Sequence, residues 1–246
     1  MHGWSAPRTL ISPGIAQAHR SGERCHGTFF KFVQLQFEIR VCDMRLGILA
    51  DIHEDVDSLK QCLNLLRRES VDLFVVLGDL FYEGHRVTET SDLLAAAGAV
   101  GVWGNHDLGL CHEPEAELLT AYPARVFDFL RTLGHRFEQE DCLFTHGLPH
   151  WDAIDPVAYY TGDEPESSRG LADTFAASRC RITFIGHFHR WLLATPGGGL
   201  PWKGEVAVTL DRDQRYLVVV GAVCEGWCAV YDTASGVLTP HRLASA

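Results

Sequence analysis

Polar side chains of the types that bind metal ions follow directly after an apolar run in this chain. The run 99–103 stops at Gly104, and an amide, an imidazole and a carboxylate follow at Asn105, His106 and Asp107. Sites in open α/β sheets lie at the carboxyl ends of the strands. This arrangement therefore indicates a functional site at the edge of a sheet.

Four other apolar runs end in the same way. Each of these short motifs is a weak signal alone, but together they favour one metal site assembled from five loops. Carboxylate, imidazole and amide ligands suit divalent ions such as Mn, Fe, Zn or Co. The run 47–50 precedes Asp51 and His53, 73–77 precedes Gly78 and Asp79, 142–145 precedes His146, and 182–185 precedes His187 and His189.

Strands and helices alternate along the chain from Met44 onward. The spacing of apolar residues predicts an amphipathic helix over roughly 55–69. An uninterrupted apolar strand at 73–77, a second helix at 88–97 and the strand before Gly104 follow it. This βαβαβ order predicts a parallel sheet with right-handed crossovers.

The second half of the chain predicts a different mixture of elements. The helical region 113–133 is broken by Pro123, and 137–140 and 142–145 look like paired strands. After His189 the chain is rich in strand and turn signals. We expect this tail to form antiparallel strands that build a second sheet stacked on the first.

Composition limits the partners of the chain. The net charge of −11 opposes binding along a nucleic-acid polymer, which requires a basic face. It does not oppose a small anionic phosphoester, because bound cations invert the local field. No apolar run reaches about 18 residues, so we expect no membrane partner. The oligomeric state is left open.

The eight cysteines do not form a regular framework. Cys224 and Cys228 make a lone C-x-x-x-C, for which a zinc site is the lesser alternative. Buried, reduced thiols of a cytoplasmic protein fit this scattered distribution better.

Residues 1–43 differ in composition from the rest and show no clear periodicity. An annotated start upstream of the natural one, a targeting segment and an ordered extension would each explain them. The strand that begins at Met44 favours Met44 as the natural start. We therefore predict an N-terminal extension over 1–43 and one functional domain over 44–246.

In order and spacing, the motifs D-x-H, G-D, G-N-H-D, H-G and G-H-x-H resemble those of the calcineurin-like metallophosphoesterase superfamily. Within it, the chain is most similar to the small, compact phosphodiesterases. The resemblance covers Met44 to about Arg190, and the C-terminal strands match loosely. It implies an α/β fold, a four-layer α/β/β/α sandwich of two mixed sheets, with two divalent metal ions as cofactors.

The resemblance also implies a role for each motif residue. His106 would give a proton or a hydrogen bond to the phosphate or the leaving oxygen. The implied reaction is hydrolysis of a small phosphodiester by a hydroxide that the two metal ions activate. The implied ligands are Asp51, His53 and His189 for the first metal, Asn105, His146 and His187 for the second, and Asp79 as the bridge between them.

The chain departs from the family pattern after the bridging carboxylate. Tyr82 stands where a second Asp is usual, and Glu83 is a weak substitute for that partner of the catalytic His. This argues against a protein phosphatase or a dinucleoside-tetraphosphate hydrolase. A phosphomonoesterase acting on a small metabolite is the close alternative. A non-catalytic scaffold that binds proteins is opposed by the presence of every motif residue, and a DNA-repair nuclease is opposed by the negative charge.

Overall fold

The computed structural model describes residues 43–162 and 164–244. The predicted N-terminal extension lies outside these residues except for Asp43. The predicted boundary between this extension and the domain therefore stays a prediction.

The first of two six-stranded sheets has the strand order β3-β2-β1-β11-β12-β9. β1, β2 and β3 run parallel to one another, as the βαβαβ pattern predicts, and β11 pairs with β1 in the antiparallel sense. The strands are β1 (Arg45–Leu49), β2 (Leu73–Leu77), β3 (Val100–Val102), β9 (Val208–Thr209), β11 (Trp227–Asp232) and β12 (Val237–Arg242).

The second sheet has the order β4-β5-β6-β10-β7-β8. It is also mixed, because β5, β6 and β10 run parallel while β4 and β7 are antiparallel to their neighbours. The strands are β4 (Phe137–Gln139), β5 (Cys142–Thr145), β6 (Ile182–Ile185), β7 (Leu192–Thr195), β8 (Gly198–Gly199) and β10 (Tyr216–Val219).

The helices begin and end where local sequence signals place them. The Asp55 side chain caps α1 by accepting a 3.0 Å hydrogen bond from the Ser58 amide. Pro123 separates α4 from α5, as predicted. No helix in the described ranges is long and apolar enough to cross a lipid bilayer. The helices are α1 (Val56–Arg68), α2 (Val87–Ala96), α3 (Leu108–Cys111), α4 (Ala116–Ala121), α5 (Ala124–Leu130) and α6 (Ser168–Ala177), with 3₁₀ turns η1 (Asn105–Asp107), η2 (Pro156–Tyr160) and η3 (Val223–Glu225).

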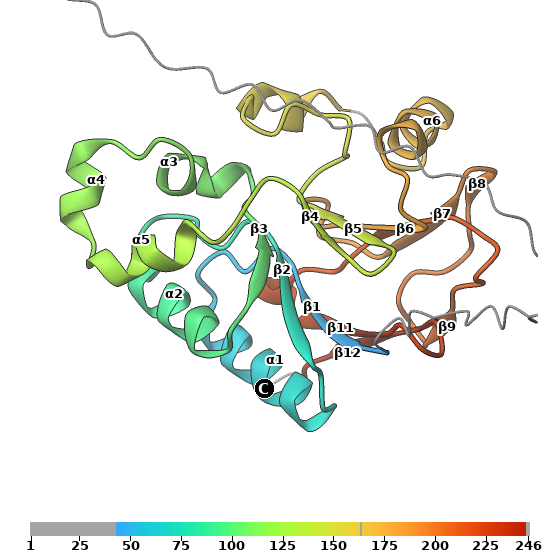
Figure 1. Cartoon of the computed structure of the whole chain (residues 1–246), viewed down its shortest axis with the longest axis horizontal. Helices are drawn as coiled ribbons and strands as arrows, with labels where there is room; N and C mark the ends of the chain where they lie inside the picture. The colour runs from blue at the N-terminus through green and yellow to red at the C-terminus, as the bar shows by residue number, and fades with distance from the viewer. Residues whose placement is uncertain (1–42, 163, 245–246) are drawn as a thin grey trace, which may run out of the picture. The chain divides into compact units, whose positions relative to one another are not determined.

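Three apolar clusters hold the elements together as four layers (Figure 1). One cluster joins α1, α2 and α5 to the first sheet, through side chains such as Leu63 and Val76. A second lies between the sheets and includes Ile48 and Phe184. A third joins the second sheet to α6 and includes Phe175. These layers confirm the predicted α/β/β/α sandwich.

The prediction for the C-terminal tail was wrong in one respect. The tail does not build the second sheet by itself: β9, β11 and β12 extend the first sheet, while β7, β8 and β10 extend the second. Alternating hydrophobicity identifies a strand and its buried face but does not specify the strand it pairs with. The tail strands thus complete both sheets around the parallel strands that carry the predicted ligands.

Candidate metal centre

The loops after β1, β2, β3, β5 and β6 meet at the carboxyl ends of these strands. The amide of Ile52 donates to the carbonyl of Asp79 at 2.8 Å, which joins the loops after β1 and β2. The amide of His187 donates to the Asp51 carboxylate at 2.9 Å, which joins the two sheets. The structure therefore brings the motif residues of all five loops to one place.

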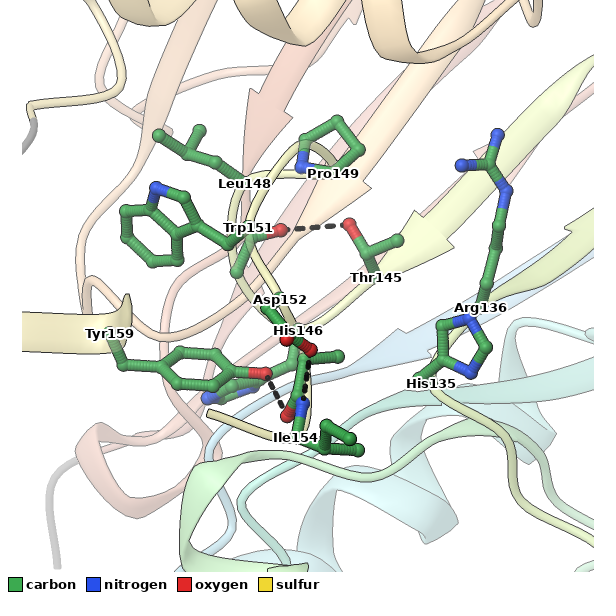
Figure 2. A pocket seen from close by; sticks show the side chains of 12 residues that line it. His135, Arg136, Thr145, His146, Leu148, Pro149, Trp151, Asp152, Ile154 and Tyr159 are labelled. Atoms are coloured by element: carbon green, nitrogen blue, oxygen red, sulfur yellow. Dashed lines mark hydrogen bonds between the residues drawn. The ribbon is translucent and has the colours of Figure 1, made fainter. Parts of the chain in front are cut away.

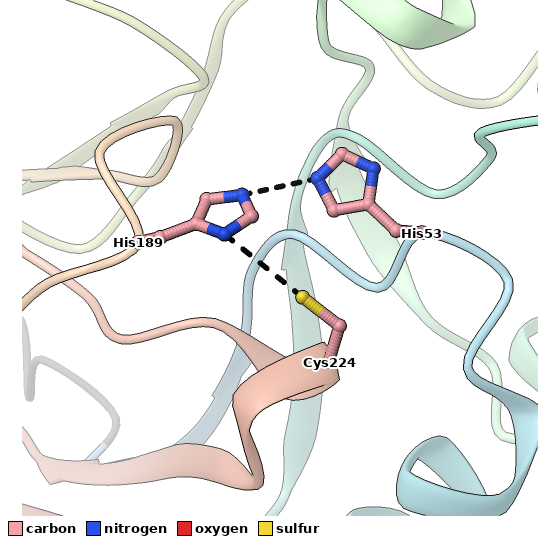
Figure 3. Close-up of side chains that lie close together, drawn as sticks. All are labelled: His53, His189 and Cys224. Carbon is pink, nitrogen blue, oxygen red and sulfur yellow. Dashed lines mark hydrogen bonds between the residues drawn. The ribbon is translucent and has the colours of Figure 1, made fainter.

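The first group of predicted ligands contains Asp51, His53 and His189. The Nε2 atoms of His53 and His189 are 3.0 Å apart, as Figure 3 shows. Oδ1 of Asp51 lies 3.7 Å from Nε2 of His189. Two imidazole nitrogens and a carboxylate oxygen thus converge on the same small space, as ligands of one cation do.

The second group contains Asn105, His146 and His187. Nε2 of His146 lies 2.9 Å from Oδ1 of Asn105, and the rings of His146 and His187 are 5.2 Å apart. Nδ1 of His146 lies 2.7 Å from the carbonyl oxygen of Leu77 and donates to it, since a carbonyl can only accept. In the neutral imidazole this bond leaves the Nε2 lone pair facing the cluster.

Asp79 lies between the two groups and is almost fully buried. Its Oδ2 is 3.7 Å from Nε2 of His53, and its Oδ1 is 3.3 Å from Nε2 of His146. The two oxygens of one carboxylate therefore face different groups, which is the placement of a ligand shared by two ions.

The imidazoles of the cluster differ in proton affinity. Burial lowers the pKa values of His53 and His189, and it lowers that of His187 to about 4, so these rings are neutral near pH 7. Burial also acts to lower the pKa of His146, but the Asp79 and Asp51 carboxylates and the hydrogen bond to the Leu77 carbonyl together outweigh it and raise that pKa to about 9. A divalent cation competes with this proton for the same lone pair, so cation binding here releases protons.

The buried acids of the cluster also favour a bound cation. Burial raises the pKa values of Asp51 and Asp107 to about 7, and the negative charge of the neighbouring Asp79 adds to the rise. Nδ1 of His53 is buried and has no hydrogen-bond partner. Buried charge is costly unless it is paired. The donor set of carboxylates, imidazoles and an amide therefore fits two borderline divalent ions.

His106 lies at the edge of the first group, where a nitrogen of its ring is within 4.8 Å of potential ligand atoms of His53 and Asp79. Its backbone amide donates to Oδ1 of Asp79 at 3.0 Å, and its exposed ring lies 5.1 Å from the ring of His53 at an angle of 88°. The predicted partner Glu83 does not contact it and instead lies 3.3 Å from His85. The catalytic role of His106 stays a prediction.

Five of the predicted ligands have a backbone conformation that non-glycine residues rarely adopt. Their φ angles lie in the left-handed region, and each costs of order 1–3 kcal/mol. Such strain persists only where the surroundings hold it, and the hydrogen bonds between the five loops do so here. The φ angles are 52° for Asp51, 47° for His53, 51° for Asp79, 68° for His187 and 49° for His189.

Gly104 explains why the G-N-H-D motif begins with glycine. A Cβ atom at this position would lie 2.3 Å from Oδ1 and 2.5 Å from the backbone nitrogen of Asp79. No side chain fits there without displacing the shared carboxylate.

Sequence reasoning missed two residues that lie against the cluster. Sγ of Cys224 is 4.0 Å from Nδ1 of His189 (Figure 3), and the hydroxyl of Tyr160 is 3.3 Å from Nδ2 of Asn105. Cys224 follows the carboxyl end of β10, so the strand-end rule could have found it. Cys228 is buried in β11 and is not among the metal-ligating clusters of the described residues, so the C-x-x-x-C zinc alternative has no support.

Two cavities border the cluster. The smaller cavity, of about 320 Å³, lies beside His146 and is lined by Trp151 and Arg136 among others (Figure 2). The larger cavity, of about 420 Å³, is lined by His53, Asp79, Tyr82, Asn105, His106, Tyr160, His187, His189 and Cys224.

Comparisons with known proteins agree with this fold. A family model described as calcineurin-like phosphoesterase matches residues 44–222. The chain is 23% identical over 194 residues to an uncharacterized protein of Methanocaldococcus jannaschii, a match that covers 72% of this chain and 75% of that protein.

Two solved structures share the fold. A metallophosphoesterase from Sphaerobacter thermophilus has a TM-score of 0.65 and 24% identity, over 82% of this chain and 88% of that one. A putative diadenosine tetraphosphatase has a TM-score of 0.50 and 17% identity, over 82% and 95%. At these identities the likeness shows the fold alone.

The family match covers most of the chain, and the sandwich with its cluster of donors is the architecture of a metal-dependent phosphoesterase. The chain belongs to the calcineurin-like phosphoesterase family. It is a phosphoric ester hydrolase of a family that depends on two metal ions.

Proposed function

We propose that this chain hydrolyses small phosphodiesters with two divalent metal ions bound in the cluster. His106 is the proposed catalytic residue. The proposed ligands are Asp51, His53 and His189 for one ion, Asn105, His146 and His187 for the other, and Asp79 for both.

The position of Asp79 carries this proposal. Its two carboxylate oxygens face opposite groups of imidazoles at 3.7 and 3.3 Å. A mononuclear site would require only one of these groups. The second group, built from the other sheet and from the turn after β3, would then have no role.

The chemistry divides between the ions and the chain. When bound, two divalent ions lower the pKa of a water molecule and offset negative charge on a phosphoryl group. The buried carboxylates and neutral imidazoles fix where that charge is offset. His106, exposed to the cavity, is placed to donate a proton to the departing alkoxide.

The lining of the larger cavity favours a diester over a monoester. It includes neither lysine nor arginine among the described residues. Arg190, next to a predicted ligand, instead pairs with Glu166 and Glu164, each at 2.7 Å. A phosphomonoester carries about two negative charges near pH 7 and gains more from added cations than a singly charged diester. The phosphomonoesterase remains the alternative for the experiment to decide.

The cysteines support a cytoplasmic location. Every cysteine in the described part of the chain is a free thiol, which is typical of a reducing compartment. We propose that location on this ground.

The proposed function is tested by comparing bis-p-nitrophenyl phosphate with p-nitrophenyl phosphate as substrates, with Mn²⁺ and with a chelator. We expect metal-dependent cleavage that favours the diester. A preference for the monoester would support the phosphatase alternative. Failure to cleave either ester, in protein shown by elemental analysis to hold two metal ions, would contradict this proposal and support a hydrolase of narrower substrate range or the non-catalytic scaffold.

A further inference from the structure

Two exposed tyrosines lie at the mouth of the larger cavity. Tyr82 is 62% exposed and Tyr160 is 69% exposed. They are the two aromatic residues among the strongly exposed large hydrophobic side chains of the described ranges, and both line the cavity that the proposed metal ligands border. Exposed aromatic faces at a binding cavity have no role in the core of the fold.

Both side chains contact the cluster, Tyr82 through its ring and Tyr160 through its hydroxyl. The ring of Tyr82 lies 5.6 Å from that of His53, edge to face, and 5.4 Å from that of His106. The Tyr160 hydroxyl accepts a 3.3 Å hydrogen bond from Nδ2 of Asn105. Each tyrosine therefore borders a residue that the proposed reaction uses, within reach of whatever is attached to a bound phosphate.

The backbone that carries Tyr82 is held firmly although its side chain is exposed. On one side, the buried Asp107 carboxylate accepts hydrogen bonds from the amides of Leu80 and Phe81 at 2.9 and 3.1 Å. On the other side, the buried Glu54 carboxylate accepts from the amide of Glu83 at 3.2 Å. A ring on so well anchored a loop loses little conformational freedom when a ligand stacks on it.

Apart from the two tyrosines, the cavity lining has few groups that could bind a part of the substrate other than its phosphate. Its lining is otherwise made of proposed metal ligands, His106 and Cys224, and includes neither lysine nor arginine among the described residues. Its volume of about 420 Å³ lies within the range of small-molecule pockets. Such a lining suits a single phosphate that carries a flat apolar group and does not suit a polyphosphate chain.

We propose that Tyr82 and Tyr160 form an aromatic binding surface that selects phosphodiesters carrying a planar aromatic group, either an aryl group or a nucleobase. This inference rests on the proposed phosphodiesterase function and names its substrate class. Stacking on exposed tyrosine is tolerant of ring chemistry, since every such ring presents a π-face.

The test measures binding of three monoesters, the class of product that cleavage of a diester releases, to the Mn²⁺-loaded full-length protein by isothermal titration calorimetry. Phenyl phosphate carries an aryl group, thymidine 5′-monophosphate carries a nucleobase, and ribose 5-phosphate has no aromatic ring. We expect one or both aromatic ligands to bind roughly 5- to 150-fold more tightly than ribose 5-phosphate. Which aromatic ligand binds more tightly distinguishes aryl from nucleoside substrates.

Substitutions assign this preference to the two tyrosines. Tyr82→Ala and Tyr160→Ala should each reduce the affinity ratio of aromatic to non-aromatic ligand, while Tyr82→Phe should retain it. Val157→Ala is the matched control, because Val157 is 68% exposed on the same turn as Tyr160 but does not line the cavity. Circular dichroism of each variant verifies that the fold is retained.

Different outcomes of this test bear on the aromatic surface and on the proposed function. Equal affinities of the wild-type protein for all three ligands, or a preference that survives both alanine substitutions, would overturn the aromatic surface. Failure of all three ligands to bind in a metal-dependent manner would refute the phosphoesterase site as well.

Discussion

Asp79 and His106 lie 27 positions apart in the sequence and are joined by one hydrogen bond from backbone to carboxylate. The contact ties the backbone of His106 to the Asp79 carboxylate. Asp79 is buried and faces both imidazole groups, whereas His106 is exposed to the cavity. Removing the Asp79 side chain should therefore affect metal binding, whereas removing the His106 side chain should affect catalysis. Both side chains nevertheless lie within one cluster of potential ligands with His53.

His106→Ala should reduce kcat for bis-p-nitrophenyl phosphate by about 10²- to 10⁴-fold, the usual contribution of a general acid. Two bound metal ions per chain should remain, because the seven proposed ligands are unchanged. Steady-state kinetics and elemental analysis of the same sample measure both quantities.

Asp79→Asn is the comparison for this experiment, since it should lose bound metal together with activity. If His106→Ala also lost its metal ions, His106 would have to be counted among the ligands rather than as the proton donor.

The candidate site was predicted from sequence to the extent that its residues follow strand ends. Asp51, Asp79 and His146 each come directly after an apolar run or its terminal glycine, so their positions in the sequence predict them. Tyr160 does not, because it lies in a 3₁₀ turn of an irregular connection and reaches Asn105 across 55 residues. A contact of that kind depends on tertiary packing and leaves no periodic signal.

At the scale of elements, buried carboxylates join the loops that carry the site. Oδ2 of Asp107 accepts from the amide of Gly104 at 2.8 Å, and its Oδ1 accepts from the amides of Leu80 and Phe81. One side chain thereby connects the loop after β3 to the loop after β2. These loops contribute Asn105 and Asp79, so their spacing depends on Asp107.

Asp107→Asn should lower the free energy of unfolding by about 1–3 kcal/mol, because at least one buried amide loses its charged acceptor. Urea denaturation of the chelated protein measures this change without a contribution from bound metal. Asp128→Asn is the matched control, since Asp128 is a 71% exposed acid on α5 and its substitution should change stability by less than about 0.5 kcal/mol. Equal losses in the two variants would show that the three bonds to Asp107 contribute nothing specific.

The elements themselves were predictable where one periodicity dominates. The helix expected over roughly 55–69 is α1, and the strand expected at 73–77 is β2 with the same bounds. The pairing of the tail was not predictable, because β10 and β11 are both apolar and either could join either sheet. Their partners are decided by long-range packing in the layer between the sheets.

For the whole molecule, the net charge of −11 has a local counterpart in the cluster. Asp51, Asp79 and Asp107 are buried together, and burial raises the pKa values of two of them. Folding therefore brings these carboxylates close together and away from water, whereas in the unfolded chain they are separated and solvated. Cations that bind this cluster bind the folded state alone, so they must stabilise it.

Removal of metal should consequently lower the melting temperature of the whole domain. An ion present at 100 times its dissociation constant contributes about 2.7 kcal/mol to the folded state. For a domain of this size, the loss of one such ion corresponds to a decrease of roughly 5–10 °C. Differential scanning calorimetry with Mn²⁺ and then with EDTA measures the shift. Asp79→Asn should show a much smaller shift, because the shared carboxylate is lost. If the variant kept the full shift, the stabilising ions would have to bind elsewhere on the chain, and the cluster around Asp79 would not be the metal centre.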